Sequence, residues 1–547
     1  MNVAEQIVKT LEERGVKYVF GLPGEENIVL VNALKASQSI HFMMVHDEQA
    51  ATFMAEMIGW LTNKPGVVIA TLGPGALNMV LGVADALTHS FPLIAISAQG
   101  GLEDKMKDTT QIIDLQQVFA PITKWSKNLT DPELTSQLIN KAYNQAVSGR
   151  PGPTFVSVPA PFEEESAGEE PDLIPNPKEE SVASDHILEK AAELIKEAER
   201  PVMLAGLGAV REQAAPAVRK WIKQYDIPIA TSYMAKGVVP EESDQALGVV
   251  GFIVEDYSNQ VFYDSDLIIT IGYEFAEFDA KEINPKGDKK IIHIHSFNMD
   301  TDRYYPVSVN VIGSICENIK QLAGKLEGYV APAYENKVQP KLVKELEEGE
   351  TDSSAPLTPV QVVHATRQAM GDKSMALVDT GAVKMWMARL FPANEPNTLL
   401  INNGLSSMAW TIPGTIAAKL IYPDKPILTI IGDGSFHMNA QELAVAKRYN
   451  IPLTIVIWDD SGYGLIKWKM DMSLGEHAKV DFENPDFVKF AEAYGGNGHV
   501  VKSRDDLELT LKKCLNEDRG ISIIVVPVDY DENMKLTDRL EDELTED

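Results

Sequence analysis

The chain has 547 residues, of which 44% are hydrophobic and 24% charged, a balance typical of a globular protein with room for three domains. Lys and Arg number 49 against 80 for Asp and Glu, which gives a formal net charge of −31. Because such a surface repels nucleic acid phosphates and anionic lipid, neither nucleic acid nor a membrane is expected as a partner.

The N-terminal segment, MNVAEQIVKTLEERG, predicts an amphipathic helix that carries three glutamates. A secretory signal would need a basic start and an apolar block. No run of about 18 apolar residues lacks charges, so no membrane span is expected. The predicted compartment is therefore the cytoplasm. Cys316 and Cys514 are too few for a disulfide framework or a zinc cluster, and are predicted to be isolated thiols.

Short apolar runs alternate with helical patterns along the chain. VVIAT from Val67, LIAIS from Leu93 and FVSVP from Phe155 predict buried parallel strands. The segment DEQAATFMAEMIGWL, which starts at Asp47, predicts a helix between them. This alternation predicts an α/β fold with parallel sheets.

Two breaks in composition divide the chain into three predicted domains, at residues 1–165, 185–325 and 360–530. The acidic, proline-bearing stretch 166–184 predicts a linker, and so does 326–359, which helix LVKELEEG interrupts. Residues 531–547 predict an acidic tail. Acidic runs at the end of the first domain, in the first linker and in the tail are expected to be solvated, namely Glu163–Glu165, Glu169–Glu170 and Glu541–Asp547.

The predicted central domain contains Gly206-Leu-Gly208 after an apolar strand. A dinucleotide-binding fingerprint would have a third glycine where this chain has Arg211. Tight packing of a strand against a helix is therefore the favoured interpretation, and a dinucleotide site is the alternative.

The most informative segment runs from Ile427 to Gly464. One apolar strand ends at Gly432–Ser435 and, after a helix, a second ends at Asp459–Gly462. Open parallel sheets bind ligands at the carboxyl ends of their strands, and Mg²⁺ takes carboxylates together with phosphates. Asp433 and Asp460 thus predict a diphosphate-bound metal, with free N–H groups at the helix that starts after Ser435. The alternative is a plain turn in which Asp433 caps a helix.

This segment resembles the thiamine diphosphate motif, in which GDG is followed about 30 residues later by Asn or Asp. The resemblance implies that the metal binds Asp433, Asp460 and the backbone carbonyl of Gly462. The usual asparagine is Asp460 here, which adds a negative charge. Further cofactor contacts are implied at Gly381, Gly432, Gly434, Ser435 and Tyr463.

The N-terminal third carries a second group of motifs. FMMVHDEQAATFMAEMIG resembles the signature that places the catalytic glutamate at Glu48. This carboxylate would bond N1′ of the aminopyrimidine and so promote loss of the proton at C2 of the thiazolium. A solvated acid in the first turn of a helix is the alternative. The neighbouring GLPGEEN and TLGPGALN imply cofactor contacts at Gly24, Gly73, Pro74 and Asn78.

A third motif, INNGLSSMAWTIPG from Ile401, resembles the stretch that supports the bent cofactor. The resemblance implies that the Ser406 carbonyl faces the 4′-amino group and that Met408 props the bend. Core packing is the alternative for Met408.

Over nearly its whole length the chain resembles the family of acetolactate synthases and related 2-oxo acid decarboxylases, in particular the FAD-free catabolic type. The resemblance implies that the three domains are a pyrimidine-binding, a central and a diphosphate-binding domain. Pyrimidine-binding and diphosphate-binding domains of different subunits form each site in this family. At least a homodimer is therefore implied, and a tetramer is expected.

The predicted substrate pocket contains Thr110, Gln111, Ile466 and Trp468. Simple decarboxylases have a His-His pair where this chain has Thr110 and Gln111, and a glutamate where it has Ile466. Without these proton donors, attack on a second 2-oxo acid is favoured over release of an aldehyde. With pyruvate the products would be 2-acetolactate and CO₂. A non-ligating decarboxylase is the alternative, and ordinary helix packing is the alternative for Trp468.

Three departures from the family pattern bear on substrate and cofactors. Glu25 and Glu26 stand where catabolic acetolactate synthases carry Ala-Lys, and Val383 where a histidine that contacts the diphosphate is common. FAD-bearing relatives have an arginine in the stretch that is Tyr273–Glu277 here, so FAD is not expected. A flavin-linked oxidase and a non-catalytic scaffold are further alternatives.

Overall fold

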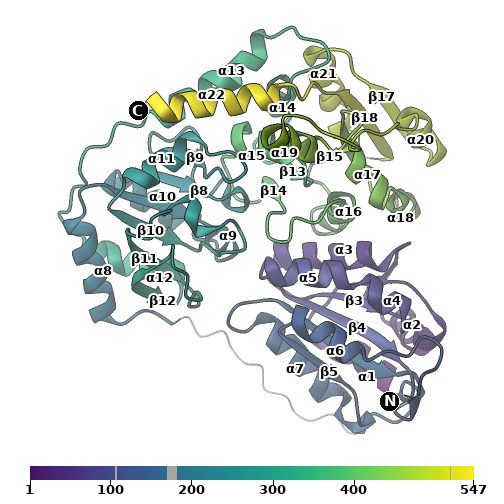
Figure 1. Ribbon diagram of the computed structural model, residues 1–547. Helices are drawn as coiled ribbons and strands as arrows, with labels where there is room; N and C mark the ends of the chain where they lie inside the picture. Colours follow the sequence, from purple (N-terminus) through teal and green to yellow (C-terminus); the bar gives the residue numbers. More distant parts are fainter. Residues whose placement is uncertain (105–106, 169–180, 518, 547) are drawn as a thin grey trace. The chain divides into compact units, whose positions relative to one another are not determined.

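The computed structural model describes residues 1–104, 107–168, 181–517 and 519–546. Within these ranges the strands form three six-stranded sheets, and the pairings between named strands are parallel. Helices lie between most successive strands along the chain (Figure 1). The predicted α/β fold with three parallel sheets is confirmed.

The first sheet has the order β2-β1-β3-β4-β6-β5. Its strands are β1 (Tyr18–Gly21), β2 (His41–Met44), β3 (Gly66–Ala70), β4 (Leu93–Gln99), β5 (Trp125–Asn128) and β6 (Pro153–Pro159). Its helices are α1 (Val3–Glu13), α2 (Ile28–Ala36), α3 (Glu48–Thr62), α4 (Pro74–Asn78), α5 (Val80–Thr88), α6 (Leu115–Phe119) and α7 (Thr135–Val147). Helices α3 and α5 cover one face, and α1, α2 and α7 cover the other (Figure 1). Strands β3 and β4 are buried on both faces, which explains their uninterrupted apolar sequence.

The second sheet has the order β12-β11-β10-β7-β8-β9, which is the strand order of dinucleotide-binding folds. Its strands are β7 (Pro201–Ala205), β8 (Ile229–Thr231), β9 (Ala246–Val249), β10 (Leu267–Ile271), β11 (Lys290–His295) and β12 (Val307–Ile312). Its helices are α8 (Asp185–Glu197), α9 (Leu207–Arg211), α10 (Ala215–Tyr225), α11 (Tyr257–Asp264) and α12 (Ile315–Lys325).

The third sheet, β14-β13-β15-β16-β18-β17, repeats the strand order of the first. Its strands are β13 (Met375–Val378), β14 (Leu399–Ile401), β15 (Ile427–Gly432), β16 (Leu453–Asp459), β17 (Asn497–Val500) and β18 (Ile521–Pro527). The helices of this part are α13 (Val338–Thr351), α14 (Pro359–Ala369), α15 (Ala382–Leu390), α16 (Thr411–Ile421), α17 (Asp433–Asn439), α18 (Leu443–Tyr449), α19 (Gly464–Leu474), α20 (Phe487–Ala493), α21 (Arg504–Leu515) and α22 (Glu532–Glu546).

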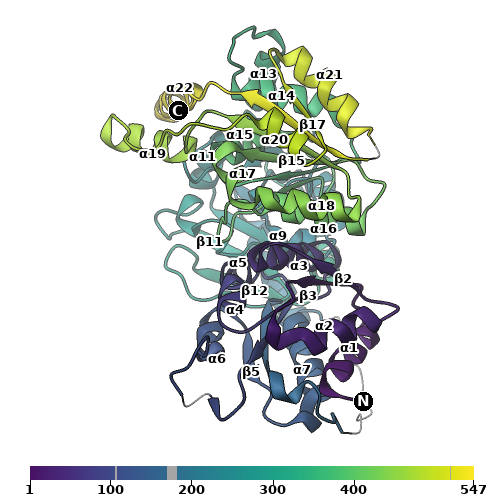
Figure 2. The ribbon, with the colours of Figure 1, turned by 90° about the vertical axis from the view of Figure 1, so that its right-hand side faces the viewer.

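Contacts between residues group the chain into two compact units. The first unit contains residues 1–178 together with 405–423 and 439–451, and the second contains the rest. Helices α16 and α18 therefore belong with the N-terminal sheet, where α16 packs on α3 (Figure 2). The second unit contains the other two sheets. The sequence analysis did not predict that α16 and α18 group with the N-terminal sheet. The domain boundaries that it gave stay a prediction.

The predicted acidic tail needs correction, because residues 532–546 form helix α22 rather than a solvated tail. Leu536 and Leu540 lie four residues apart on this helix and are buried against the core of the second unit. The linker predicted at 326–359 does contain a helix, α13. Of the linker predicted at 166–184, residues 169–180 lie outside the described part of the chain.

Glu163 is a second correction, because it was expected in a solvated acidic run and is only 1% exposed. Its carboxylate accepts hydrogen bonds from the backbone N–H groups of Val29 and Leu30, the latter at 3.1 Å. These groups belong to the first turn of α2, which has no side-chain cap of its own. Glu163 therefore provides the hydrogen-bond acceptor for the first N–H groups of α2, a helix more than 100 residues earlier in the sequence.

The Gly206-Leu-Gly208 turn between β7 and α9 is confirmed as a packing feature. A Cβ on Gly206 would lie 2.4 Å from the Cα of Tyr273, and one on Gly208 would lie 2.8 Å from the Cα of Gly272. Both glycines are required because the end of the adjacent strand β10 approaches their backbone closely.

No helix in the described ranges is long and apolar enough to cross a bilayer. Cys316 and Cys514 form no disulfide, as their number predicted.

Candidate active site

The two predicted metal carboxylates follow neighbouring strands of the third sheet. Gly432 at the end of β15 pairs with Trp458 of β16, so Asp433 and Asp460 leave the sheet at the same edge. Helix α17 begins at Asp433 itself, three residues earlier than the expected start after Ser435. The N-terminus of α17 thus lies directly at the carboxylate, and the N–H of Gly434 donates to Asp433 Oδ1 at 2.7 Å.

The adjacent strand β13 brings a third turn to this edge. The Ser435 hydroxyl donates to the carbonyl of Thr380 at 3.4 Å, which places Gly381 beside the Gly432–Ser435 turn. Gly381 has a φ of +148°, and a Cβ on Gly432 would meet no atom within 4 Å. The order of the sheet reverses between β13 and β15, which is where open α/β sheets bind ligands.

Electrostatics at this edge suit a cation. Burial, and then the charge of Asp433, raise the pKa of Asp460 to about 8. Burial also raises the pKa of Asp433 to about 6. Ionising both carboxyl groups together is costly because their charges repel. The ionisation becomes favourable once a divalent cation lies between them. This set of buried oxygen donors fits Mg²⁺, which prefers carboxylates and phosphate oxygens.

Asn484 is a polar partner of these carboxylates that the sequence did not indicate. Its side-chain amide donates to Asp433 Oδ2 at 2.7 Å and to Asp459 Oδ1 at 2.8 Å. Its own carbonyl oxygen lies 3.0 Å from Nε2 of His437. Asn484 therefore fixes the orientation of Asp433 from a loop 24 residues beyond Asp460.

The turn that carries Gly462 is held by the same loop. The N–H of Tyr463 donates to the carbonyl of Val480 at 2.9 Å, and the N–H of Phe482 donates to the carbonyl of Ser461 at 2.9 Å. A Cβ on Gly434 would lie 2.8 Å from the Tyr463 ring, so these two predicted cofactor contacts are neighbours.

Glu48 is the first residue of α3, and Asp47 caps this helix by accepting from the N–H of Gln49. The Glu48 side chain is almost buried, at 7% exposed, rather than solvated. Asn78 of the TLGPGALN motif donates to Glu48 Oε2 at 3.0 Å. Burial raises the pKa of Glu48, and the bond from Asn78 lowers it by less. The solvated-acid alternative is therefore wrong for Glu48.

The three N-terminal motifs converge around these residues. A Cβ on Gly24 would lie 2.5 Å from Cβ of Thr71, whose hydroxyl donates to Glu26 at 2.6 Å. Gly73 has a φ of +58° just before Pro74 starts α4, and a Cβ on it would lie 2.9 Å from Cβ of Gln111. Gln111 and its neighbour Thr110 are exposed.

The Ser406–Ala409 turn has an unusual backbone. Ser406 and Ala409 have φ values of +57° and +66°, a region that residues with a Cβ seldom adopt. Asn439 donates to the Ala409 carbonyl at 2.9 Å and so holds the end of the turn. Met408 is only half-buried, unlike a residue of the core.

The predicted pocket residues of α19 differ from each other. Ile466 is 47% exposed, one helical turn after the predicted metal-binding loop. Trp468 is 1% exposed, and its indole N–H donates to the hydroxyl of Thr537 on α22 at 3.0 Å. The pocket assignment of Trp468 is therefore corrected to its alternative, packing between two helices. Val383 is also buried.

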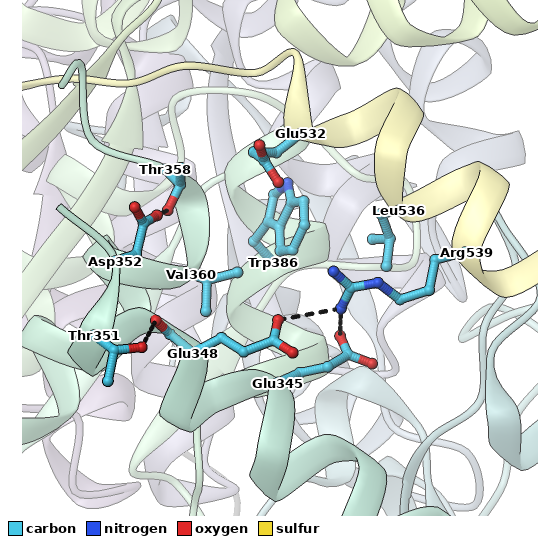
Figure 3. A pocket seen from close by; sticks show the side chains of 10 residues that line it. All are labelled: Glu345, Glu348, Thr351, Asp352, Thr358, Val360, Trp386, Glu532, Leu536 and Arg539. Atoms are coloured by element: carbon cyan, nitrogen blue, oxygen red, sulfur yellow. Dashed lines mark hydrogen bonds and ion pairs between the residues drawn. The ribbon is translucent and has the colours of Figure 1, made fainter. Parts of the chain in front are cut away.

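A cavity of about 310 Å³ in the second unit contains none of the predicted residues. Figure 3 shows it between α13, α14 and α22, with Trp386 on its wall. The Arg539 guanidinium lies 3.5 Å from the carboxylate of Glu345 and 3.4 Å from that of Glu348 (Figure 3). These two ion pairs already balance the charge of Arg539 in the cavity.

Three sequence profiles of one family match the chain. The N-terminal binding domain of thiamine pyrophosphate enzymes matches residues 1–118, the central domain 188–322, and the C-terminal binding domain 379–526. The chain belongs to the thiamine pyrophosphate enzymes. The three sheets of the fold coincide with the three domains of this family.

Several thiamine pyrophosphate enzymes match over nearly their full lengths. An acetolactate synthase from Bacillus subtilis is 33% identical, over 99% of this chain and 96% of its own. A catabolic acetolactate synthase from Raoultella terrigena is 28% identical, over 98% and 97%. The large subunit of acetolactate synthase isozyme 1 from Escherichia coli is 29% identical, over 97% and 94%. The predicted resemblance to acetolactate synthases is confirmed.

Proposed function

We propose that the chain is a thiamine diphosphate- and Mg²⁺-dependent carboligase that converts two 2-oxo acids to a 2-hydroxy-2-acyl acid and CO₂. The observation that carries the proposal is the pair of carboxylates at the ligand-binding edge of the third sheet, the buried Asp433 and the partly buried Asp460. When bound, the cofactor supplies a stabilised carbanion equivalent at the former carbonyl carbon.

With pyruvate, the bond between C1 and C2 of the donor breaks and CO₂ leaves. A new bond then forms from C2 of the donor to C2 of the acceptor, and the acceptor oxygen takes up one proton. The product is 2-acetolactate. No oxidant or reductant is consumed, so the reaction needs no redox cofactor.

Each residue has a separate role in the proposal. Asp433, Asp460 and the Gly462 carbonyl would hold the metal, and the first turn of α17 would lie beside the diphosphate. Glu48 would hydrogen-bond N1′ of the aminopyrimidine and serve as the proton donor and acceptor for that atom. Burial raises the pKa of Glu48 above its ordinary value, which moves it toward the range in which a carboxyl group exchanges protons efficiently.

Ile466 and Gln111 support carboligation over simple decarboxylation. Ile466 is exposed just beyond the metal loop and offers no proton, and Gln111 lies beside Gly73 of the TLGPGALN motif. With no carboxyl or imidazole at these two positions, protonation that would release an aldehyde is slow relative to attack on a second 2-oxo acid.

The central domain is proposed to hold no FAD. In its strand order a dinucleotide would place its pyrophosphate at the N-terminus of α9. There the N–H of Leu207 donates to the Glu277 carboxyl at 2.9 Å, and the N–H of Glu274 donates to it at 2.9 Å. The Ser232 hydroxyl bonds the same group. An internal carboxyl group thus takes the phosphate position, and purified protein is expected to lack absorbance near 450 nm.

The active form is proposed to be at least a homodimer, because Glu48 and Asp433 belong to different compact units. In the family, such units of two subunits share each cofactor. Tetramer assembly and a cytoplasmic location stay predictions.

Product analysis tests the proposal. Purified protein with thiamine diphosphate and Mg²⁺ is incubated with pyruvate, 2-oxobutyrate and branched 2-oxo acids, and the products are identified by mass. Acetolactate and CO₂ in equal amounts from pyruvate are expected. Acetaldehyde without acetolactate would instead support the non-ligating decarboxylase.

A further inference from the structure

Glu56, Asp85 and His89 form a buried cluster in the first unit. Asp85 and His89 lie outside the cofactor motifs, and Glu56 lies eight residues after Glu48 in the same motif. Nδ1 of His89 lies 2.8 Å from Glu56 Oε1 and 3.9 Å from Asp85 Oδ2. Glu56 also hydrogen-bonds the Asp85 side chain. The imidazole and the Asp85 carboxylate are fully buried, and Glu56 nearly so. Buried groups of this kind persist only where partners compensate their desolvation.

The cluster reaches the Ser406–Ala409 turn directly. The Ser407 hydroxyl donates to Asp85 Oδ1 at 3.0 Å, although the two residues are 322 positions apart. One turn further along α5, the Thr88 hydroxyl accepts from the backbone N–H of Leu405 at 3.1 Å. Two bonds therefore attach this turn to the end of α5.

This attachment matters because the turn is strained. Ser406 and Ala409 both have positive φ values, which are unfavourable for residues with a Cβ and persist only when surrounding contacts impose them. Asn439 holds the Ala409 end. At the Ser406 end, the bond from Ser407 to Asp85 fulfils this role.

The cluster is also part of the helix that begins with Glu48. Glu56 lies eight residues after Glu48 on α3, on the same face of the helix. Trp60, one turn further, stacks on Trp410 with ring centroids 5.8 Å apart. The Ser406–Ala409 turn and the Glu48 helix are therefore anchored to one buried network.

We propose that Asp85 and Ser407 are positioning residues, which hold the Ser406 carbonyl and the Met408 side chain in the geometry that the bound thiamine diphosphate requires. This inference rests on the proposed function, because the role of the turn is that of a cofactor support. Glu56 and His89 act through Asp85, since they fix the carboxylate that accepts from Ser407.

The protonation of Glu56 agrees with this arrangement. Burial raises the pKa of Glu56 well above its ordinary value, and the hydrogen bond between the Glu56 and Asp85 side chains lowers it by less. A proton shared between these two carboxyl groups avoids two adjacent negative charges in the core. Asp85 Oδ1 meanwhile accepts from the Ser407 hydroxyl.

Ser407→Ala tests the inference, with Ser157→Ala as the matched control. Ser157 is a buried serine on β6 whose hydroxyl also bonds a side chain, that of Asn128. Affinity for thiamine diphosphate is measured by quenching of tryptophan fluorescence at saturating Mg²⁺. Hydrogen–deuterium exchange at C2 of the bound cofactor is followed by NMR after acid quench, and thermal unfolding reports on folding.

Ser407→Ala is expected to slow both C2 exchange and kcat by about tenfold, with a much smaller change in KM and in cofactor affinity. Asp85→Asn keeps an acceptor for the Ser407 hydroxyl, so C2 exchange and kcat are expected to fall less than in Ser407→Ala. Ser157→Ala should leave C2 exchange and kcat as in the wild type. C2 exchange in Ser407→Ala equal to that in Ser157→Ala overturns the inference.

The two proposals fail in different ways. If the wild type forms acetolactate and Ser407→Ala exchanges C2 at the control rate, the positioning role is wrong and the proposed function stands. If the wild type binds the cofactor and exchanges C2 but forms no acetolactate, carboligation is wrong. Slow exchange in Ser407→Ala would still support the positioning role in that case.

Discussion

The side-chain amide of Asn78 donates a hydrogen bond to the carboxyl group of Glu48, with Nδ2 3.0 Å from Oε2. This bond joins two motifs that lie 30 residues apart. It holds the carboxyl group at the start of α3 in one orientation, while burial raises its pKa. A carboxyl group with a fixed orientation and a raised pKa suits proton exchange with an aminopyrimidine.

Glu48→Gln is expected to lower kcat for acetolactate formation by about 10²–10⁴-fold, because the amide cannot exchange the proton. Cofactor affinity should change little, since glutamine keeps the shape of the side chain and a bond to Asn78. Steady-state kinetics and fluorescence titration with thiamine diphosphate measure the two effects. Wild-type activity in Glu48→Gln would remove the proposed mechanism.

A mixed dimer tests whether two subunits share each site. Glu48→Gln and Asp433→Asn subunits are each expected to be inactive alone, and a heterodimer is purified through two different tags. If Glu48 serves the cofactor held by the partner subunit's Asp433, one site of the heterodimer is intact and about half of the wild-type activity returns. An inactive heterodimer would mean that each site lies within one subunit.

Asn484→Ala is expected to raise the Mg²⁺ concentration for half-saturation by about tenfold, because Asp433 loses the amide that orients it. Mg²⁺ is titrated into chelator-treated protein at fixed thiamine diphosphate, with calorimetry beside the activity assay. Asn497→Ala, an exposed asparagine on β17, is the control. Equal Mg²⁺ affinity in both variants would contradict the role of Asn484.

Thr537→Val is expected to destabilise the protein by about 1–3 kcal/mol, because the buried indole N–H of Trp468 loses its acceptor. Thr537→Ser keeps the hydroxyl and should stay close to the wild type. Unfolding of the second unit is followed by near-ultraviolet circular dichroism, which reports on Trp468. Equal stability of the two variants would argue against the link between α19 and α22.

Glu163→Gln is expected to change how stability depends on pH. Burial raises the pKa of Glu163 to about 7 in the folded protein, from an ordinary value of 4.5. The folded state therefore binds this proton more tightly than the unfolded state does. The resulting stability is fully present below pH 4.5 and is lost as the pH rises through about 7.

Between pH 4.5 and 8, the free energy of unfolding of the wild type should thus fall by on the order of 3 kcal/mol more than that of Glu163→Gln. Chemical unfolding at both pH values gives the difference. Glu164→Gln, the exposed neighbour, should follow the wild type. A parallel pH dependence of wild type and Glu163→Gln would show that Glu163 is ionised in the folded protein.

The sequence alone was enough to predict the parallel sheets and the edge where Asp433 and Asp460 meet. Apolar runs of strand length mark strands buried on both faces, and parallel strands present their carboxyl ends at one edge. The apolar runs are a local feature of the sequence. The shared edge follows from the regular alternation of strand, helix and strand. The Glu48 helix and its Asp47 cap are local in the same sense.

Only the tertiary structure decided which distant polar side chains meet. Asn484 reaches Asp433 through the course of an irregular loop, and Glu163 reaches the start of α2 from the end of the first sheet. Acidic composition predicted a tail where Leu536 and Leu540 instead bury one face of α22. Asn78 also meets Glu48 only because α3 and α4 pack together. Such pairings depend on the paths of loops and on packing between elements, which have no periodic signature in the sequence.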